Sequence, residues 1–127
     1  MSGHPSRARE YLGHMLDAVG RIQEYVGGKS AENFLVDRLL QDGVVRNFEI
    51  LGEASRNILE SVPDAASKFP AIPFAAIYGM RNQLSHGYFA IDLDVVWKVI
   101  ERDIPALRKE LEAAIVPLDK PPLDGGR

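Results

Sequence analysis

Apolar residues recur at steps of three and four along most of the chain, and no segment alternates convincingly between apolar and polar positions. Steps of three and four place side chains on one face of an α-helix, whereas alternation is typical of a half-buried strand. The pattern therefore predicts an all-α protein in which amphipathic helices pack around one core. We expect an antiparallel helical bundle of about four main helices.

The first two predicted helices are separated by a glycine pair. The first helix begins near Ser6 and ends before Gly27-Gly28, because glycine commonly terminates helices. Ser30 is a good N-cap residue for the second, whose apolar stripe extends as far as Ile58. Gly43 lies inside this stripe, and glycine costs about 1 kcal/mol relative to alanine in a helix interior. We therefore expect a bend or a break at Gly43.

Prolines mark the connection to the third predicted helix. Pro63, Pro70 and Pro73 lie between the second and third apolar stripes. Pro73 suits the first turn of a helix, where the missing N–H carries no penalty. Gly87 is expected to end this third helix, so the helix is short.

The last predicted helix begins at Asp92 or Asp94, since either carboxylate can cap its first turn. Pro105 falls inside its apolar stripe and should kink it. The composition after this stripe is that of a frayed terminus. We therefore expect one helical domain over residues 1–116 and a flexible C-terminal tail over residues 117–127.

Composition and charge limit the class of protein. A chain of 127 residues fits one domain, and 15 Lys and Arg against 18 Asp and Glu give a net charge of −3, so any nucleic acid must bind at a local patch. The absence of cysteine excludes disulfides, and three histidines make a metal site a poor expectation. No apolar run has the length of a membrane span or a secretory signal. We expect a cytoplasmic protein without a membrane anchor, a metal or another cofactor.

Polar residues that could carry chemistry gather between the third and fourth predicted helices, in the run Arg81-Asn82-Gln83-Leu84-Ser85-His86-Gly87-Tyr88-Phe89. Asn82 and His86 are four residues apart and share a helix face, whereas Arg81 lies about 140° from His86 around an ideal helix. Two routes could bring Arg81 and His86 together. Either the helix ends so that His86 leaves the regular path, or a second copy of the protein contributes its own residues to a shared cleft.

These residue types suit cleavage of a phosphodiester without a metal. A histidine exchanges protons near neutral pH, and an arginine guanidinium binds two phosphate oxygens and stabilises the charge that builds on phosphorus. Asn82 could orient the imidazole or the phosphate, or make a local hydrogen bond. On spacing alone, a structural role for His86 at the helix end remains the stronger alternative.

Ordered sequence blocks add a resemblance. Gly52-Glu53-Ala54, Gly79-Met80-Arg81-Asn82 and Leu84-Ser85-His86-Gly87-Tyr88-Phe89 resemble blocks of the HepT-like toxins of the HEPN superfamily, over roughly residues 8–115. The signature of that family is an arginine, four to six residues, a histidine and then a tyrosine two residues later. Arg81, His86 and Tyr88 fill these positions. Phe74 and Ser85 depart from the usual tryptophan and alanine, which affects packing more than chemistry.

The resemblance implies a metal-independent endoribonuclease that acts as a homodimer with both motifs in one cleft. It implies a toxin of a type VII toxin–antitoxin system that cuts RNA by attack of the 2′-hydroxyl and leaves a 2′,3′-cyclic phosphate. Its catalytic residues would be Arg81, His86 and Asn82. It also implies a cognate MntA-type nucleotidyltransferase antitoxin, which neutralises the toxin by transferring AMP from ATP to Tyr88 and could form a higher oligomer with it.

Other interpretations of the same residues stay open. Arg81 could pair with Glu53 across the bundle as well as bind phosphate, and Tyr88 could be an ordinary core aromatic. Arg46 and Glu53 are seven residues apart and share a helix face, so they could support the cleft or be solvated charges. The alternative function is a non-catalytic helical dimer that binds and assists a nucleotidyltransferase. A plain structural bundle is the third interpretation.

Overall fold

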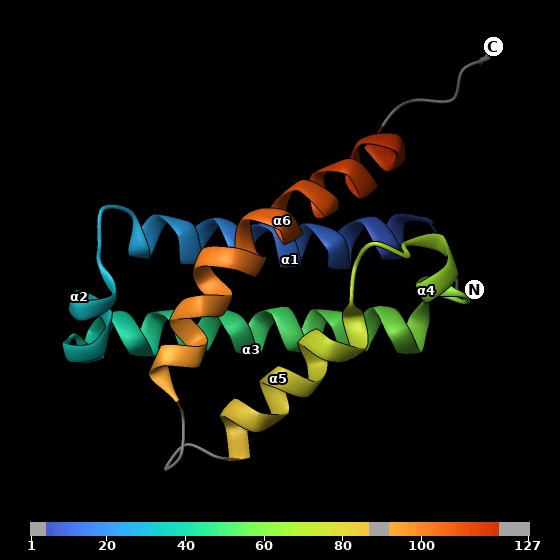
Figure 1. Cartoon of the computed structure of the whole chain (residues 1–127). Helices are drawn as coiled ribbons and strands as arrows, with labels where there is room; N and C mark the ends of the chain where they lie inside the picture. Colours follow the sequence, from blue (N-terminus) through green and yellow to red (C-terminus); the bar gives the residue numbers. More distant parts are fainter. Residues whose placement is uncertain (1–4, 87–91, 120–127) are drawn as a thin grey trace.

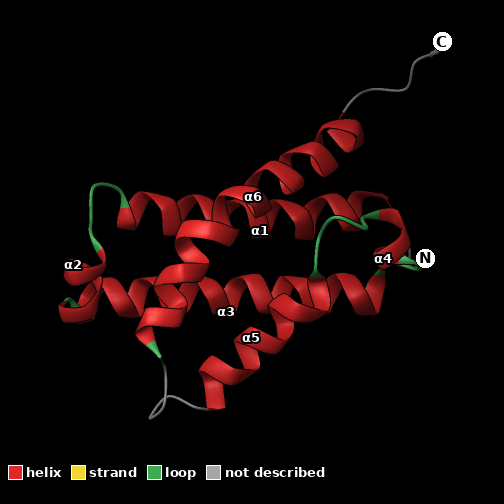
Figure 2. Cartoon of the chain, in the orientation of Figure 1, coloured by secondary structure: helices red, strands yellow, loops and turns green. Residues whose placement is uncertain are grey.

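The computed structural model describes residues 5–86 and 92–119, and within these residues every regular element is a helix (Figures 1 and 2). The predicted all-α fold is therefore confirmed. Four long helices form the body of the molecule, and two short helices lie in the connections. In chain order the helices are α1 (Pro5–Val26), α2 (Ala31–Val36), α3 (Arg38–Ser61), α4 (Ala65–Lys68), α5 (Phe74–His86) and α6 (Leu93–Asp119).

Helix α3 lies between α1 and α5 and is antiparallel to both, while α6 packs across α1 (Figure 1). Most of the apolar stripe of α1 is buried in this arrangement, and Val44 and Ile58 of α3 are fully buried. Burial of each such side chain contributes roughly 1.5–3 kcal/mol, so the stripes that predict the helices also hold them together. The fully buried residues of α1 are Leu12, Met15, Ala18, Val19 and Ile22.

The break in the second predicted helix lies at Asp37, and the prediction of a bend or break at Gly43 is wrong. Asp37 has extended backbone angles and ends α2, and its carboxylate accepts a hydrogen bond from the Leu40 N–H at 3.0 Å. It thereby caps the first turn of α3. Gly43 lies inside the continuous α3, where an added Cβ would approach the Tyr25 ring to 3.2 Å. Close packing of α1 on α3 thus explains the glycine.

The connection between α3 and α5 contains the short helix α4, which the sequence did not predict. Asp64, before α4, has a left-handed backbone with φ of 57°. Helix α5 then begins directly after Pro73, whose carbonyl accepts a hydrogen bond from the Ile77 N–H at 3.0 Å. The predicted end of this helix at Gly87 lies outside the described residues.

Helix α6 starts as predicted and ends later than predicted. The Asp92 carboxylate accepts hydrogen bonds from two N–H groups of the first turn, those of Asp94 and Val95. Pro105 lies inside the helix, and in Figure 1 the helix axis changes direction part-way along. The helix continues through residues 117–119, which were expected to belong to the tail.

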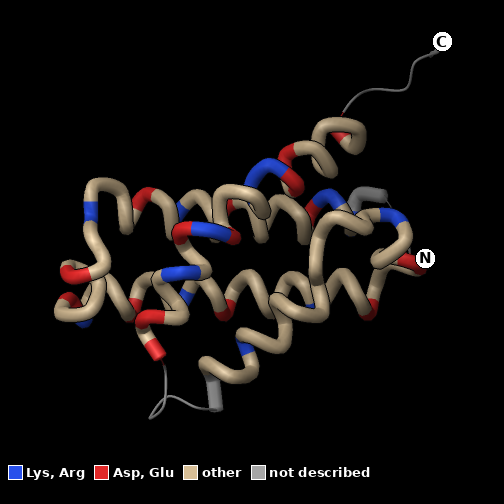
Figure 3. The backbone as a smooth tube through the Cα atoms, in the orientation of Figure 1, with Lys and Arg blue, Asp and Glu red and all other residues tan. Residues whose placement is uncertain are grey.

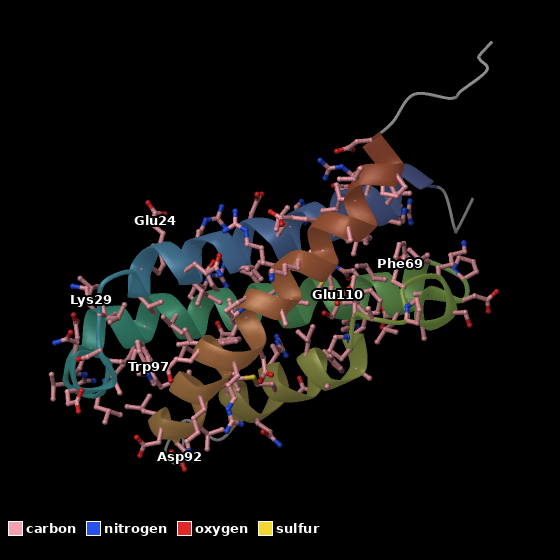
Figure 4. All side chains as sticks on the ribbon, turned by 45° about the horizontal axis from the view of Figure 1, so that its top comes forward. Glu24, Lys29, Phe69, Asp92, Trp97 and Glu110 are labelled. Atoms are coloured by element: carbon pink, nitrogen blue, oxygen red, sulfur yellow. The ribbon has the colours of Figure 1, made fainter. Side chains whose placement is uncertain are left out.

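Contacts at both ends of α6 connect it to the other helices. The guanidinium Nε of Arg9 on α1 lies 2.5 Å from the carboxylate of Asp119. This hydrogen bond raises the pKa of Arg9 and holds the last turn of α6 against α1. Near the other end, the ring centroid of Trp97, which is labelled in Figure 4, lies 5.4 Å from the ring centroid of Phe34 on α2. None of the described helices is long and apolar enough to span a bilayer.

Candidate active site

Arg81 is the one charged residue of α5 from Phe74 to Leu84, the blue segment of that helix in Figure 3, and its side chain contacts α3. The contact on α3 is at Gly52. A Cβ added there would overlap the Cβ of Arg81 and lie 2.5 Å from its Cγ. The aliphatic stem of Arg81 therefore lies directly against the backbone of α3, and its guanidinium continues from there to the surface.

The guanidinium of Arg81 has polar neighbours on two helices. Its Nη2 lies 3.8 Å from the Glu53 carboxylate, and its Nη1 donates a hydrogen bond to the Asn82 side-chain oxygen at 3.1 Å. The Nε is buried and has no hydrogen-bond partner among the residues that the structure describes. A buried polar N–H without a partner costs free energy, and the accessible part of the guanidinium is its two terminal nitrogens.

A groove of about 410 Å³ opens beside Arg81. It is lined by three helices: one residue comes from α1, a face of α3 forms the floor, and α5 supplies Arg81 at the edge. Arg46 and Glu53 both line this groove, so the structure brings them together with Arg81. The complete lining is His14, Arg46, Glu49, Ile50, Glu53, Ala54, Asn57 and Arg81.

Charges of both signs line the groove. The Arg46 guanidinium lies 4.0 Å from the Glu49 carboxylate, and the Arg56 guanidinium lies 3.3 Å from the Glu53 carboxylate. The Arg46 side chain is 71% exposed, so its pair with Glu49 is weak and its charge is accessible to a polyanion. Arg46 and Arg81 are therefore the two guanidinium groups with which the groove could hold a nucleic-acid backbone.

Asn57 and His14 are among the groove residues that the sequence did not single out. Asn57 follows Arg46 by eleven residues and Glu53 by four, so helical spacing alone could have placed it on the same face of α3. His14 belongs to α1. Its place beside the α3 face depends on how α1 packs, for which the local sequence offers no signal.

A second groove, of about 320 Å³, lies between α3, α5 and α6. Its lining is mostly apolar, with Asp103 and Glu110 of α6 as the acidic members. Acidic residues on an apolar surface do not suit a phosphodiester backbone. The groove beside Arg81 is therefore the better candidate for a site that acts on nucleic acid.

His86 is the last residue of α5 that the structure describes, and Tyr88 lies outside the described residues. Helix α5 keeps its helical backbone up to His86, so the positions of Arg81 and His86 are about 140° apart around its axis. Helix α5 therefore does not end before His86. The route through a second copy of the chain stays a prediction.

The family model described as "Ribonuclease HepT-like" matches residues 15–114, which include α3, α5 and most of α6. The chain belongs to the HepT-like ribonuclease family. The resemblance found in the sequence is confirmed, and as a member of this family the chain is an endoribonuclease. The matched residues contain Arg81, Asn82 and His86, and all of the groove lining except His14.

Individual relatives agree with the family model. A "Probable ribonuclease HepT" of Thermococcus cleftensis is 38% identical over 104 residues, which are 82% of this chain and 92% of that protein. A "Putative RNase" of Methanocaldococcus jannaschii is 34% identical over 82% of this chain and 93% of that protein. A larger "Gamma-glutamylcyclotransferase and putative RNase" of the same organism is 36% identical over 87% of this chain, which spans about half (48%) of that relative. No solved structure matches the chain significantly.

Proposed function

We propose that this HepT-like ribonuclease is the toxin of a toxin–antitoxin pair and that it cuts RNA without a metal ion, with Arg81 on the scissile phosphate. The observation that carries the proposal is the placement of Arg81. It is the single charged side chain of the described α5 face, its stem is fixed on α3, and its guanidinium lines a groove. Such a group is preorganised to bind an anion.

Each step of the reaction has a residue of the matching chemistry. A base removes the proton from the 2′-hydroxyl, whose oxygen then attacks phosphorus. The bond from phosphorus to the 5′-oxygen breaks, and an acid donates a proton to the departing oxygen. His86 acts as acid or base, Arg81 stabilises the charge on the phosphate, and Asn82, which accepts a hydrogen bond from Arg81, orients the guanidinium. The products are a 2′,3′-cyclic phosphate and a 5′-hydroxyl.

The active cleft in this proposal is shared by two copies of the chain. Helix α5 is regular up to His86, so Arg81 and His86 lie on different sides of one helix. Two copies related by a two-fold axis would let the Arg81 of one chain act with the His86 of the other. A homodimer is therefore part of the proposed mechanism.

Control by a nucleotidyltransferase is the last part of the proposal. The Tyr88 hydroxyl would attack the α-phosphate of ATP, release pyrophosphate and retain AMP. Tyr88 follows Arg81 by seven residues in the sequence, and the added phosphate would bring negative charge to the motif that is meant to bind RNA. An AMP group at this position would occupy the cleft and repel the RNA backbone, which explains how transfer could neutralise a toxin.

The test is an RNA cleavage assay of the purified protein in EDTA. Wild type is expected to cut RNA, and Arg81→Ala and His86→Ala are expected to lose at least about 100-fold in kcat. Arg102→Ala, which removes an exposed arginine of α6 away from the groove, is the matched control and should keep its activity. Size-exclusion chromatography of each variant shows whether the dimer persists.

Two outcomes would contradict the proposal. If wild type leaves RNA intact in EDTA but binds a nucleotidyltransferase, the non-catalytic alternative is favoured. If Arg81→Ala cuts as fast as wild type while remaining dimeric, Arg81 does not bind the scissile phosphate.

A further inference from the structure

The contact between Arg81 and Gly52 distinguishes Gly52 from the other described glycines. A Cβ at Gly79 or Gly20 would meet no atom within 4 Å. A Cβ at Gly13 would meet the far end of the Arg9 side chain, which can move away. At Gly52 the obstacle is the Cβ and Cγ of Arg81, which are close to the backbone of α5 and cannot move without it.

This contact limits where the Arg81 guanidinium can point. The Cβ and Cγ of Arg81 lie against α3, and its Cδ would be 3.4 Å from a Cβ at Gly52. A stem held along this length loses much of the rotamer freedom that a surface arginine normally keeps. The guanidinium then reaches Glu53, the neighbour of Gly52, and the groove edge. The absence of a side chain at position 52 therefore sets the position of the charge.

We propose that Gly52 is a positioning residue for Arg81, an inference that rests on the proposed ribonuclease function. Gly52 touches neither RNA nor the reacting atoms. It allows α5 to approach α3 closely enough for the Arg81 stem to be clamped, so that the guanidinium meets the phosphate without first being ordered. Ordering charge donors before the reaction is a large part of catalysis by electrostatic stabilisation.

The test compares Gly52→Ala with Gly79→Ala. Both replace a glycine in a helix interior, so both gain up to about 1 kcal/mol of helix propensity. Gly79→Ala adds a methyl group to open space and is expected to keep kcat within about twofold of wild type. Gly52→Ala displaces Arg81 and is expected to lower kcat by at least about 30-fold, with a smaller change in KM, because the lost contact acts in the transition state.

A structural readout accompanies the assay. Crystal structures of the two variants are expected to show the Arg81 guanidinium moved away from Glu53 in Gly52→Ala and unmoved in Gly79→Ala. If Gly52→Ala does not fold, the double variant Gly52→Ala/Arg81→Gly removes the obstructing stem. It is expected to recover a cooperative melting transition, and a double variant that also fails to fold would overturn the inferred contact.

The inference and the proposed function fail in different ways. Equal kcat values for folded Gly52→Ala and Gly79→Ala, with wild type active, would overturn the positioning role alone. A wild type that cuts no RNA would overturn the ribonuclease mechanism and the positioning role with it.

Discussion

The Arg81 guanidinium on α5 lies 3.8 Å from the Glu53 carboxylate on α3, and the two side chains are 31% and 47% exposed. The same carboxylate also pairs with Arg56 at 3.3 Å. The ion pair between Glu53 and Arg81 at the groove edge is therefore long and solvent-accessible. A phosphate can replace Glu53 as the partner of Arg81 at little cost, because exposed pairs contribute about 0–1 kcal/mol.

Glu53→Gln should consequently have a small effect. The variant removes the charge and keeps the shape, and we expect kcat/KM within about fivefold of wild type because a pair of this kind contributes less than about 1 kcal/mol. Glu60→Gln, which removes the other carboxylate paired with Arg56, is the matched control. A loss of 100-fold in Glu53→Gln alone would show that Glu53 takes part in the reaction itself.

Arg46→Ala should weaken RNA binding more than it slows the chemical step. Arg46 lines the groove, and its exposed charge is separated from Arg81 by the α3 face. A phosphate contact at this place would raise KM with little change in kcat, and would lower the salt dependence of binding by about one unit of slope. Cleavage kinetics measure KM and kcat, and titration of a single-stranded RNA at several salt concentrations measures the salt slope of binding. Arg102→Ala is the control. An unchanged salt slope would place the RNA outside this groove.

Tyr88→Phe should keep RNA cleavage and lose the inhibition of cleavage by AMP transfer. The variant retains the ring and lacks the oxygen that would accept AMP. Wild type co-expressed with its cognate nucleotidyltransferase is expected to gain the mass of AMP and to lose activity, whereas Tyr88→Phe keeps both its mass and its cleavage. Tyr78→Phe on α5 is the matched control and should behave as wild type does. Gain of AMP by Tyr88→Phe would assign the modification to another residue.

Asp37→Ala should destabilise the fold without affecting the groove. Asp37 caps α3 by accepting the Leu40 N–H, and the loss of such a cap costs about 1 kcal/mol. Urea denaturation followed by circular dichroism measures this change in the free energy of unfolding. Asp42→Ala, an exposed aspartate inside α3, is the control and should be neutral or slightly stabilising. Equal stability of the two variants would show that the cap at Asp37 contributes nothing.

The amino-acid sequence predicted most of the helices in the fold. Helical spacing of apolar residues predicted the four long helices, because amphipathic periodicity is a local property of a segment. The break predicted at Gly43 lies at Asp37 instead, which shows the limit of predictions from local periodicity and helix propensity. Helix propensity alone disfavours Gly43 inside a helix, whereas the packing of Tyr25 against α3 makes a glycine suitable there. Asp37 ends one helix and caps the next.

Some features of the candidate site were likewise predictable from the sequence, and others depend on the tertiary structure. The spacing of Arg81, Asn82 and His86 and the shared helix face of Arg46 and Glu53 are properties of single helices, and the sequence by itself determined them. The meeting of Arg81 with Gly52, and of His14 with the α3 face, joins helices that are far apart along the chain, and tertiary structure alone decided it. The physical reason is that helix geometry relates residues a few positions apart, whereas close packing of side chains selects which helix faces meet.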